Sequence, residues 1–150
     1  MRIVFLGTAA VVPEPGRDTA SFVVNETLLF DTGWQAALRL AAVGLSPQAV
    51  THLFLTHAHQ DHYLGLPGLL VARAMRPAPD QPPLRIFGPA GAVEAAVERS
   101  RAFLGEPTAI GAHEIFPLEP GATREVEGLE IATADFCQVL LCLNEFLYVD

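Results

Sequence analysis

Three histidines and one aspartate crowd into a short polar stretch that directly follows a strand-sized apolar run. The run is Leu53-Phe54-Leu55, and the stretch reads Thr56-His57-Ala58-His59-Gln60-Asp61-His62. Imidazole and carboxylate are ligands that Zn²⁺ prefers, and a loop lets several of them converge on one point. A solvated loop with incidental histidines would be the alternative, but four of the five histidines lie between positions 52 and 62. The segment therefore predicts a metal-binding loop at the end of a rigid strand.

Strand-like and helix-like patterns alternate along the first part of the chain, and strands follow in series after it. Strands are expected over residues 2–6, 21–24, 27–30, 52–55 and 84–87, and later over 114–118, 124–126 and 129–133. Helices are expected after Gly33 (with Ala37, Leu38, Ala41 and Ala42 at helical spacing), over 66–75, and from Gly88-Pro89 onward. This order predicts an α/β (α+β) architecture, in which a mixed sheet carries helices on its outer face.

Length and charge narrow the class of protein. The 150 residues suit a single domain with a substantial core, and the net charge is −8 with every basic residue an arginine. The arginines form no long basic stripe, which argues against tight autonomous binding to RNA or DNA. The apolar runs are too short to span a membrane, and the chain enters a strand at once, leaving no room for a signal peptide. A cytoplasmic protein is expected.

The order H-x-H-x-D-H after an apolar strand resembles the signature of the metallo-β-lactamase superfamily. Other segments are similar to its tRNA 3′-processing branch, ribonuclease Z: Phe5-Leu6-Gly7-Thr8, Leu29-Phe30-Asp31-Thr32-Gly33, Gly65-Leu66-Pro67-Gly68-Leu69-Leu70, Ile86-Phe87-Gly88-Pro89 and Glu119-Pro120-Gly121. The resemblance runs from residue 2 to about residue 136. It implies an αββα sandwich, of which residues 1–150 would be a partial domain containing the N-terminal half.

The resemblance also implies a role for each residue of the motif. His57 and His59 would bind a first metal ion, and Asp61 and His62 a second, with Asp61 also handling the proton of the attacking water. Asp31 would lie behind these ligands and fix the geometry of the histidine loop, or cap the helix that follows it; the two roles are compatible. The two remaining histidines, at positions 52 and 113, are expected to be structural.

The implied function is that of a zinc-dependent hydrolase, a phosphodiesterase like ribonuclease Z that uses metal-activated water. Two Zn²⁺ ions are expected, with Mn²⁺ or iron as alternatives, and the substrate would be a phosphodiester such as a tRNA precursor. One alternative is a metal-binding remnant without catalysis, stabilised by self-association as a homodimer. Another is a hydrolase of a different ester or thioester, because the motif leaves the substrate open.

The C-terminal segment departs from the family pattern. Members complete the site with a third histidine, a bridging aspartate and a final histidine, whereas no histidine follows His113 here. Cys137 and Asp150 are weak candidates for the missing ligands. Residues 137–150 contain no Ala, Gly, Pro or Arg and are interpreted as an atypical C-terminal strand. A terminus altered by truncation or a frame change, and a genuine short variant, both remain open interpretations.

Overall fold

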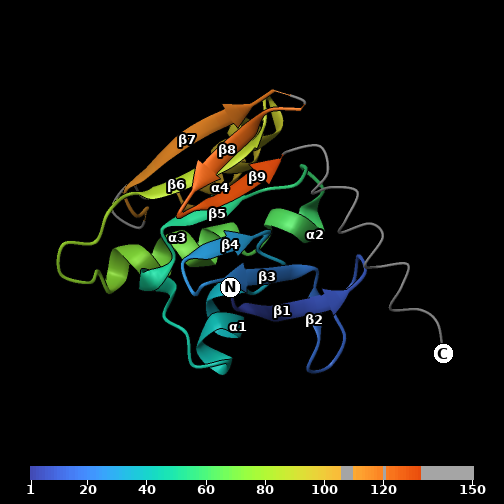
Figure 1. The fold of residues 1–150 in the computed structure, drawn as a ribbon. Coiled ribbons are helices and arrows are strands. Elements are labelled where there is room, and N and C mark those ends of the chain that lie inside the picture. The colour runs from blue at the N-terminus through green and yellow to red at the C-terminus, as the bar shows by residue number, and fades with distance from the viewer. Residues whose placement is uncertain (106–109, 120, 133–150) are drawn as a thin grey trace.

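The computed structural model describes residues 1–105, 110–119 and 121–132 (Figure 1). Its strands are β1 (Ile3–Ala9), β2 (Asp18–Thr19), β3 (Ser21–Val24), β4 (Leu28–Phe30), β5 (His52–Phe54), β6 (Leu84–Pro89), β7 (His113–Leu118), β8 (Thr123–Val126) and β9 (Leu129–Ala132). Its helices are α1 (Ala36–Ala42), the 3₁₀ turn η1 (Pro47–Ala49), α2 (Gln60–Tyr63), α3 (Leu66–Met75) and α4 (Ala92–Leu104). The described part of the chain thus confirms the predicted alternation of strands and helices.

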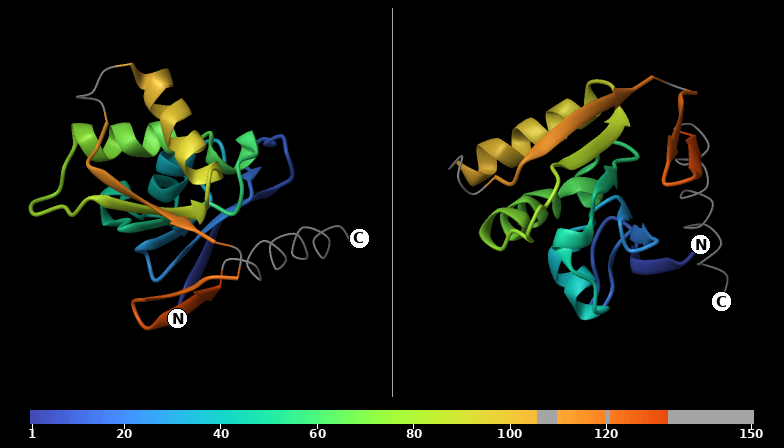
Figure 2. Two further views of the ribbon diagram at one scale, coloured as in Figure 1. Left: turned by 90° about the horizontal axis from the view of Figure 1, so that it is seen from above. Right: turned by 60° about the vertical axis from the view of Figure 1, so that its left-hand side comes forward.

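Seven strands form one mixed sheet in the order β2-β1-β3-β4-β5-β6-β7. Strands β4 to β7 run parallel to one another, whereas β3 is antiparallel to both of its neighbours. The helices α3 and α4 lie against one face of the sheet, and the separate β8–β9 hairpin lies on the other side (Figure 2). This is the predicted mixed sheet with helices on its outer face.

Both faces of the central strands are buried, which explains why these strands read as continuous apolar runs. In the segment around β5, Leu53 and Leu55 join the core under the helices, while Phe54 points into the core on the hairpin side. On that second face a ladder of stacked rings crosses the sheet, with centroids 4.8–5.0 Å apart. Its members are Phe22, Phe30, Phe54, Phe87 and Phe116. Stacked aromatic pairs on neighbouring strands fix the register of the sheet.

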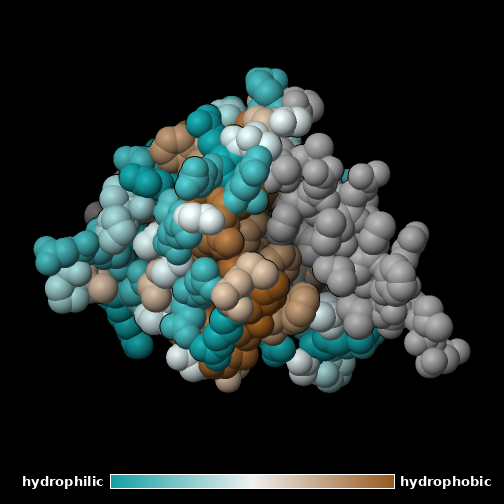
Figure 3. Space-filling view, viewed as in Figure 1, coloured by the Kyte–Doolittle hydropathy of each residue, from teal (hydrophilic) through white to brown (hydrophobic). Residues whose placement is uncertain are grey.

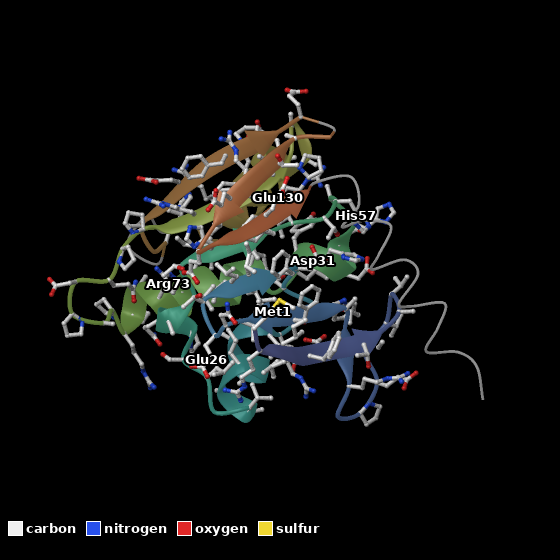
Figure 4. The ribbon with its side chains drawn as sticks, in the orientation of Figure 1. Met1, Glu26, Asp31, His57, Arg73 and Glu130 are labelled. Atoms are coloured by element: carbon white, nitrogen blue, oxygen red, sulfur yellow. The ribbon has the colours of Figure 1, made fainter. Side chains whose placement is uncertain are left out.

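A fully buried arginine joins α3 to the segment that precedes β5. The Arg73 guanidinium donates hydrogen bonds to the main-chain carbonyls of Pro47, Gln48, Val50 and Pro82. Burial lowers the pKa of Arg73, and the four carbonyl acceptors replace part of the lost hydration. Figure 4 shows this residue at the opposite end of the sheet from His57.

The sequence misplaced or missed four local features, the first of which is helix α2 at residues 60–63, in a stretch that was expected to be a loop. The predicted inward residue Leu38 is 67% exposed, and α1 instead buries Ala36 and Leu40. The helix is apolar almost all round, so spacing alone could not choose its inner face. Strand β6 continues to Pro89, and α4 therefore begins at Ala92 rather than at Gly88. The two-residue strand β2 was not predicted, because so short a strand leaves no periodic pattern.

Some large apolar side chains remain on the surface. Figure 3 shows apolar surface gathered near the centre and below it on the face seen in Figure 1, beside the part drawn in grey. Among the described residues Ile3, Phe5 and Leu38 are exposed by 45%, 53% and 67%. Within the same described residues, no helix has both the length and the apolar character that a membrane crossing requires.

Candidate metal centre

The candidate site lies where two neighbouring parallel strands end. Asp31 directly follows β4, and Thr56 and His57 follow the extension of β5, whose register with β4 pairs Phe30 with Phe54. Because parallel strands share one carboxyl edge, these residues emerge side by side, as Asp31 and His57 do in Figure 4. The sequence positions therefore meet in space because of the strand order.

Asp31 is the buried centre of the site. Its side chain is fully buried, and its carboxylate accepts hydrogen bonds from the Thr56 amide (2.9 Å), the Thr56 hydroxyl (2.8 Å) and His62 Nδ1 (2.7 Å). Its backbone lies at φ 51°, a region that Asp tolerates better than most side chains. Asp31 does not cap α1: the Trp34 and Gln35 amides donate instead to the carboxylate of Asp18. The carboxylate of Asp31 faces the histidine loop.

His62 is oriented by this contact. Burial by itself would lower the pKa of His62, but the hydrogen bond and charge of Asp31, helped by the charge of Asp61, outweigh it and raise the pKa. With Nδ1 on Asp31, the other ring nitrogen, Nε2, lies 3.3 Å from the Asp61 carboxylate. A carboxylate behind one ring nitrogen leaves the other free to bind a metal ion.

Asp61 and His62 form one pair of candidate metal ligands, and His57 and His59 form a second pair. Each is called a donor pair below. His57 Nδ1 lies 2.9 Å from the Thr56 hydroxyl, and its Nε2 lies 3.0 Å from His59 Nδ1. Burial, and then the neighbouring His62, lower the pKa of His57, although the carboxylates of Asp31 and Asp61 oppose the shift. A lowered pKa favours the neutral imidazole, which is the form that binds metals.

The two donor pairs have spacings that suit zinc. Two ligand atoms at about 2.0–2.1 Å from a tetrahedral Zn²⁺ are about 3.4 Å apart. The His57–His59 separation of 3.0 Å and the Asp61–His62 separation of 3.3 Å are close to this value. Among the described residues no three His, Cys, Asp or Glu side chains form one group able to hold a metal ion. Each pair alone supplies two ligand atoms, so a tetrahedral shell at either pair requires further ligands.

The other residues considered from the sequence lie outside this group of side chains or outside the described residues. Cys137 and Asp150 lie outside the described residues. His52 is buried in β5 and stacks with Phe87 at 5.9 Å between ring centroids, which places it within the packing of the sheet. His113 is half-buried at the start of β7, with Nδ1 2.9 Å from the Gly111 carbonyl.

Several residues that support the site were not identified from the sequence. Thr56 and Thr32 adjoin predicted site residues, and both contact the loop: Thr32 donates its amide to the His62 carbonyl at 2.8 Å. Asp18 and Thr19 lie far from the motif, in a segment where the sequence carries no periodic pattern. Thr19 donates its hydroxyl to the Asp61 carbonyl at 2.7 Å. Only the folded structure brings these residues to the loop.

Sequence comparison gives consistent matches. Residues 15–134 match the family model described as the metallo-beta-lactamase superfamily. A protein named ribonuclease Z from Streptococcus uberis is 30% identical, and the match covers 96% of this chain and 49% of that protein. A ribonuclease Z from Methanothermobacter thermautotrophicus is 39% identical over 61% of this chain and 30% of that protein. The chain spans at most about half the length of these relatives.

Solved structures show the same fold. The short form of human tRNase Z superposes with a TM-score of 0.68 at 31% identity, covering 80% of this chain and 46% of that one. The metallo-β-lactamase-fold protein YhfI from Bacillus subtilis superposes with a TM-score of 0.63 at 18% identity, covering 83% of this chain and 48% of that one, a likeness of fold alone. With its sheet, its helices and its matched residues 15–134 taken together, this chain belongs to the metallo-β-lactamase superfamily.

Proposed function

We propose that this chain carries the metal-binding part of a metal-dependent hydrolase that cleaves phosphodiester bonds, in the manner of ribonuclease Z. The observation that carries the proposal is the pairing of ligand atoms at one sheet edge: His57 Nε2 with His59 Nδ1, and His62 Nε2 with the Asp61 carboxylate. The relatives named ribonuclease Z support the phosphodiester substrate, and a tRNA precursor is the substrate proposed here.

The residues have distinct roles in this proposal. His57 and His59 hold one Zn²⁺ ion, and Asp61 and His62 hold a second. A bound divalent metal lowers the pKa of water and neutralises negative charge on the phosphoryl oxygens. Asp61, which is largely buried, accepts the proton of the attacking water. Asp31 holds His62 in the ligand tautomer through the 2.7 Å contact with Nδ1.

The charge of the chain limits how it can hold RNA. A net charge of −8, with no lysine, gives little general attraction for phosphates. Contact with the substrate would therefore depend on the metal ions at the sheet edge, so hydrolysis of a small phosphodiester should not require a large RNA-binding surface. Other esters and thioesters remain the competing substrate class.

Hydrolysis assays test the proposal. Purified protein loaded with Zn²⁺ should hydrolyse bis(p-nitrophenyl) phosphate and cleave a tRNA precursor carrying a 3′ trailer. His59→Ala and Asp61→Asn should reduce the rate at least about 100-fold, because each removes a metal ligand. His113→Ala, at a histidine outside the site, should retain the wild-type rate.

The substrate panel also contains a thioester and a chromogenic β-lactam. Turnover of either one without phosphodiester cleavage would contradict the phosphodiesterase assignment. Phosphodiester cleavage that survives His59→Ala unchanged would instead contradict the assignment of the reaction to this metal centre. Trials with Mn²⁺ and Fe²⁺ in place of Zn²⁺ identify the metal that gives the highest rate.

A further inference from the structure

The helix that carries Asp61 and His62 is too short to satisfy its own carbonyl groups. Helix α2 has four residues, and the last carbonyls of a helix lack intrahelical donors. The Gly65 amide, which in a continuing helix would reach the Asp61 carbonyl, donates instead to the Gly33 carbonyl at 2.7 Å. The carbonyls of both proposed ligands therefore require donors from elsewhere in the fold.

Two threonines from separate segments supply these donors. The Thr32 amide donates to the His62 carbonyl at 2.8 Å, and the Thr19 hydroxyl donates to the Asp61 carbonyl at 2.7 Å. The two segments reach the helix from different parts of the sheet, one from the turn after β4 and the other from β2. Thr32 lies beside Asp31, which already holds His62. Thr19 makes the corresponding contact for Asp61.

Thr19 is itself held rigidly. It is fully buried, and β2 pairs in parallel with β1, placing Thr19 opposite Ala9. The neighbouring carboxylate of Asp18 is also buried and accepts hydrogen bonds from the amides of Thr19 (2.8 Å), Trp34 (3.1 Å) and Gln35 (2.9 Å). One carboxylate thus joins β2 to the turn that leads into α1. A buried hydrogen-bonded group of this kind has little freedom to follow a moving partner.

We infer that Thr19 is a positioning residue, whose hydroxyl fixes the main chain of Asp61 and thereby sets the carboxylate that would bind the second metal ion. The inference rests on the proposed function and deepens it, since it assigns to β2 the support of Asp61 in the ligand pair Asp61 and His62. Removing the hydroxyl leaves the Asp61 carbonyl without this donor and allows the short helix to shift. Outer partners of metal ligands typically alter metal affinity about 10–100-fold.

Matched variants of Thr19 and a distant threonine test this inference. Thr19→Val removes the hydroxyl at nearly constant shape, and Thr19→Ser keeps it. Thr27→Val is the control, because the Thr27 hydroxyl donates to Glu127, outside the candidate site. Zn²⁺ affinity is measured by competition with a chelator, and the visible absorption of the Co²⁺-loaded protein reports ligand geometry. The unfolding of metal-free protein by urea is followed separately.

Thr19→Val should bind Zn²⁺ at least about 10-fold more weakly and show an altered Co²⁺ spectrum. Thr19→Ser and Thr27→Val should keep the wild-type affinity and spectrum. If Thr19→Val does not fold, Asp18→Asn replaces it, with the same expected loss because its three amide donors then face a neutral acceptor. Lower stability with unchanged metal affinity would make Thr19 merely structural and overturn the inference. Wild-type protein that binds no metal would instead refute the proposed function itself.

Discussion

His57 and His62 lie with their ring centroids only 4.0 Å apart, yet their pKa values shift in opposite directions. Burial lowers both values, but only His62 shares a hydrogen bond with the Asp31 carboxylate. The opposite directions therefore come from the carboxylate that contacts His62, because burial acts in the same direction on the pKa of both rings. The opposite shifts favour the neutral imidazole in His57 and the protonated ring in His62.

His52 provides a pH test that is separate from the proposed metal ligands. Burial, and then the positive charge of Arg85, lower its pKa, while Glu127 opposes the shift. A histidine whose folded pKa lies below its unfolded value of about 6.5 stabilises the fold relative to low pH. The contribution of His52 to the free energy of unfolding should therefore be largest above about pH 6.5. It should decrease as the pH falls through that value toward the folded pKa.

Urea unfolding of the metal-free protein from about pH 7.5 to about pH 5.5 measures this dependence, with a chelator present throughout. His52→Gln should make the decrease in stability shallower, because it removes one titrating group. Arg85→Gln should act in the same direction by a smaller amount, since it removes only the second cause of the shift. A slope unchanged by His52→Gln would show that His52 does not contribute to the pH dependence.

At the scale of single elements, the sequence predicted the strands and helices that carry a regular apolar pattern and missed those that do not. Strands β4 and β5 were predictable because both of their faces are apolar, and α3 because Leu66, Leu69 and Leu70 lie at helical spacing. The inner face of α1 could not be predicted from a helix that is apolar nearly all round. Strand β2 was missed because its two residues are held by tertiary hydrogen bonds rather than by any pattern of their own.

The close approach of β2 to β1 depends on Gly7. A Cβ atom at this position would lie 2.0 Å from the Thr19 carbonyl oxygen and 2.6 Å from that of Asp18. Both neighbours are main chain, so the strands would have to separate. Gly7→Ala should therefore destabilise the fold by about 1–3 kcal/mol or more and also weaken Zn²⁺ binding, because Thr19 would move with β2. Urea unfolding and chelator competition measure the two effects.

Gly68 in α3 is the matched control for that substitution. A Cβ atom there would meet nothing within 4 Å, and the residue has ordinary helical geometry. Gly68→Ala should stabilise the protein by about 0.5–1 kcal/mol through helix propensity and leave Zn²⁺ affinity unchanged. Equal stability changes for the two alanine variants would show that β2 can yield to a methyl group without strain.

For the whole molecule, the sequence predicted the architecture more completely than the site. The mixed sheet, its covering helices and the superfamily were all predicted, because apolar periodicity and the histidine motif are local signals. The support of the motif was only partly predictable. Asp31 was identified through the resemblance of Leu29-Phe30-Asp31-Thr32-Gly33 to ribonuclease Z, whereas Thr19 reaches Asp61 only through the order of the strands. Contacts between distant segments leave no local signal in a single sequence.

The measurement that tests the central claim most directly is the zinc-binding stoichiometry, determined by isothermal titration of metal-free wild type, His59→Ala, His62→Ala and His113→Ala. The account predicts that wild type and His113→Ala bind zinc with the same stoichiometry, two ions per chain. His59→Ala and His62→Ala should each lose one ion, because they belong to different donor pairs. Zinc binding that is absent in wild type, or that is unchanged in both His59→Ala and His62→Ala, would contradict the assignment of the metal centre to this sheet edge.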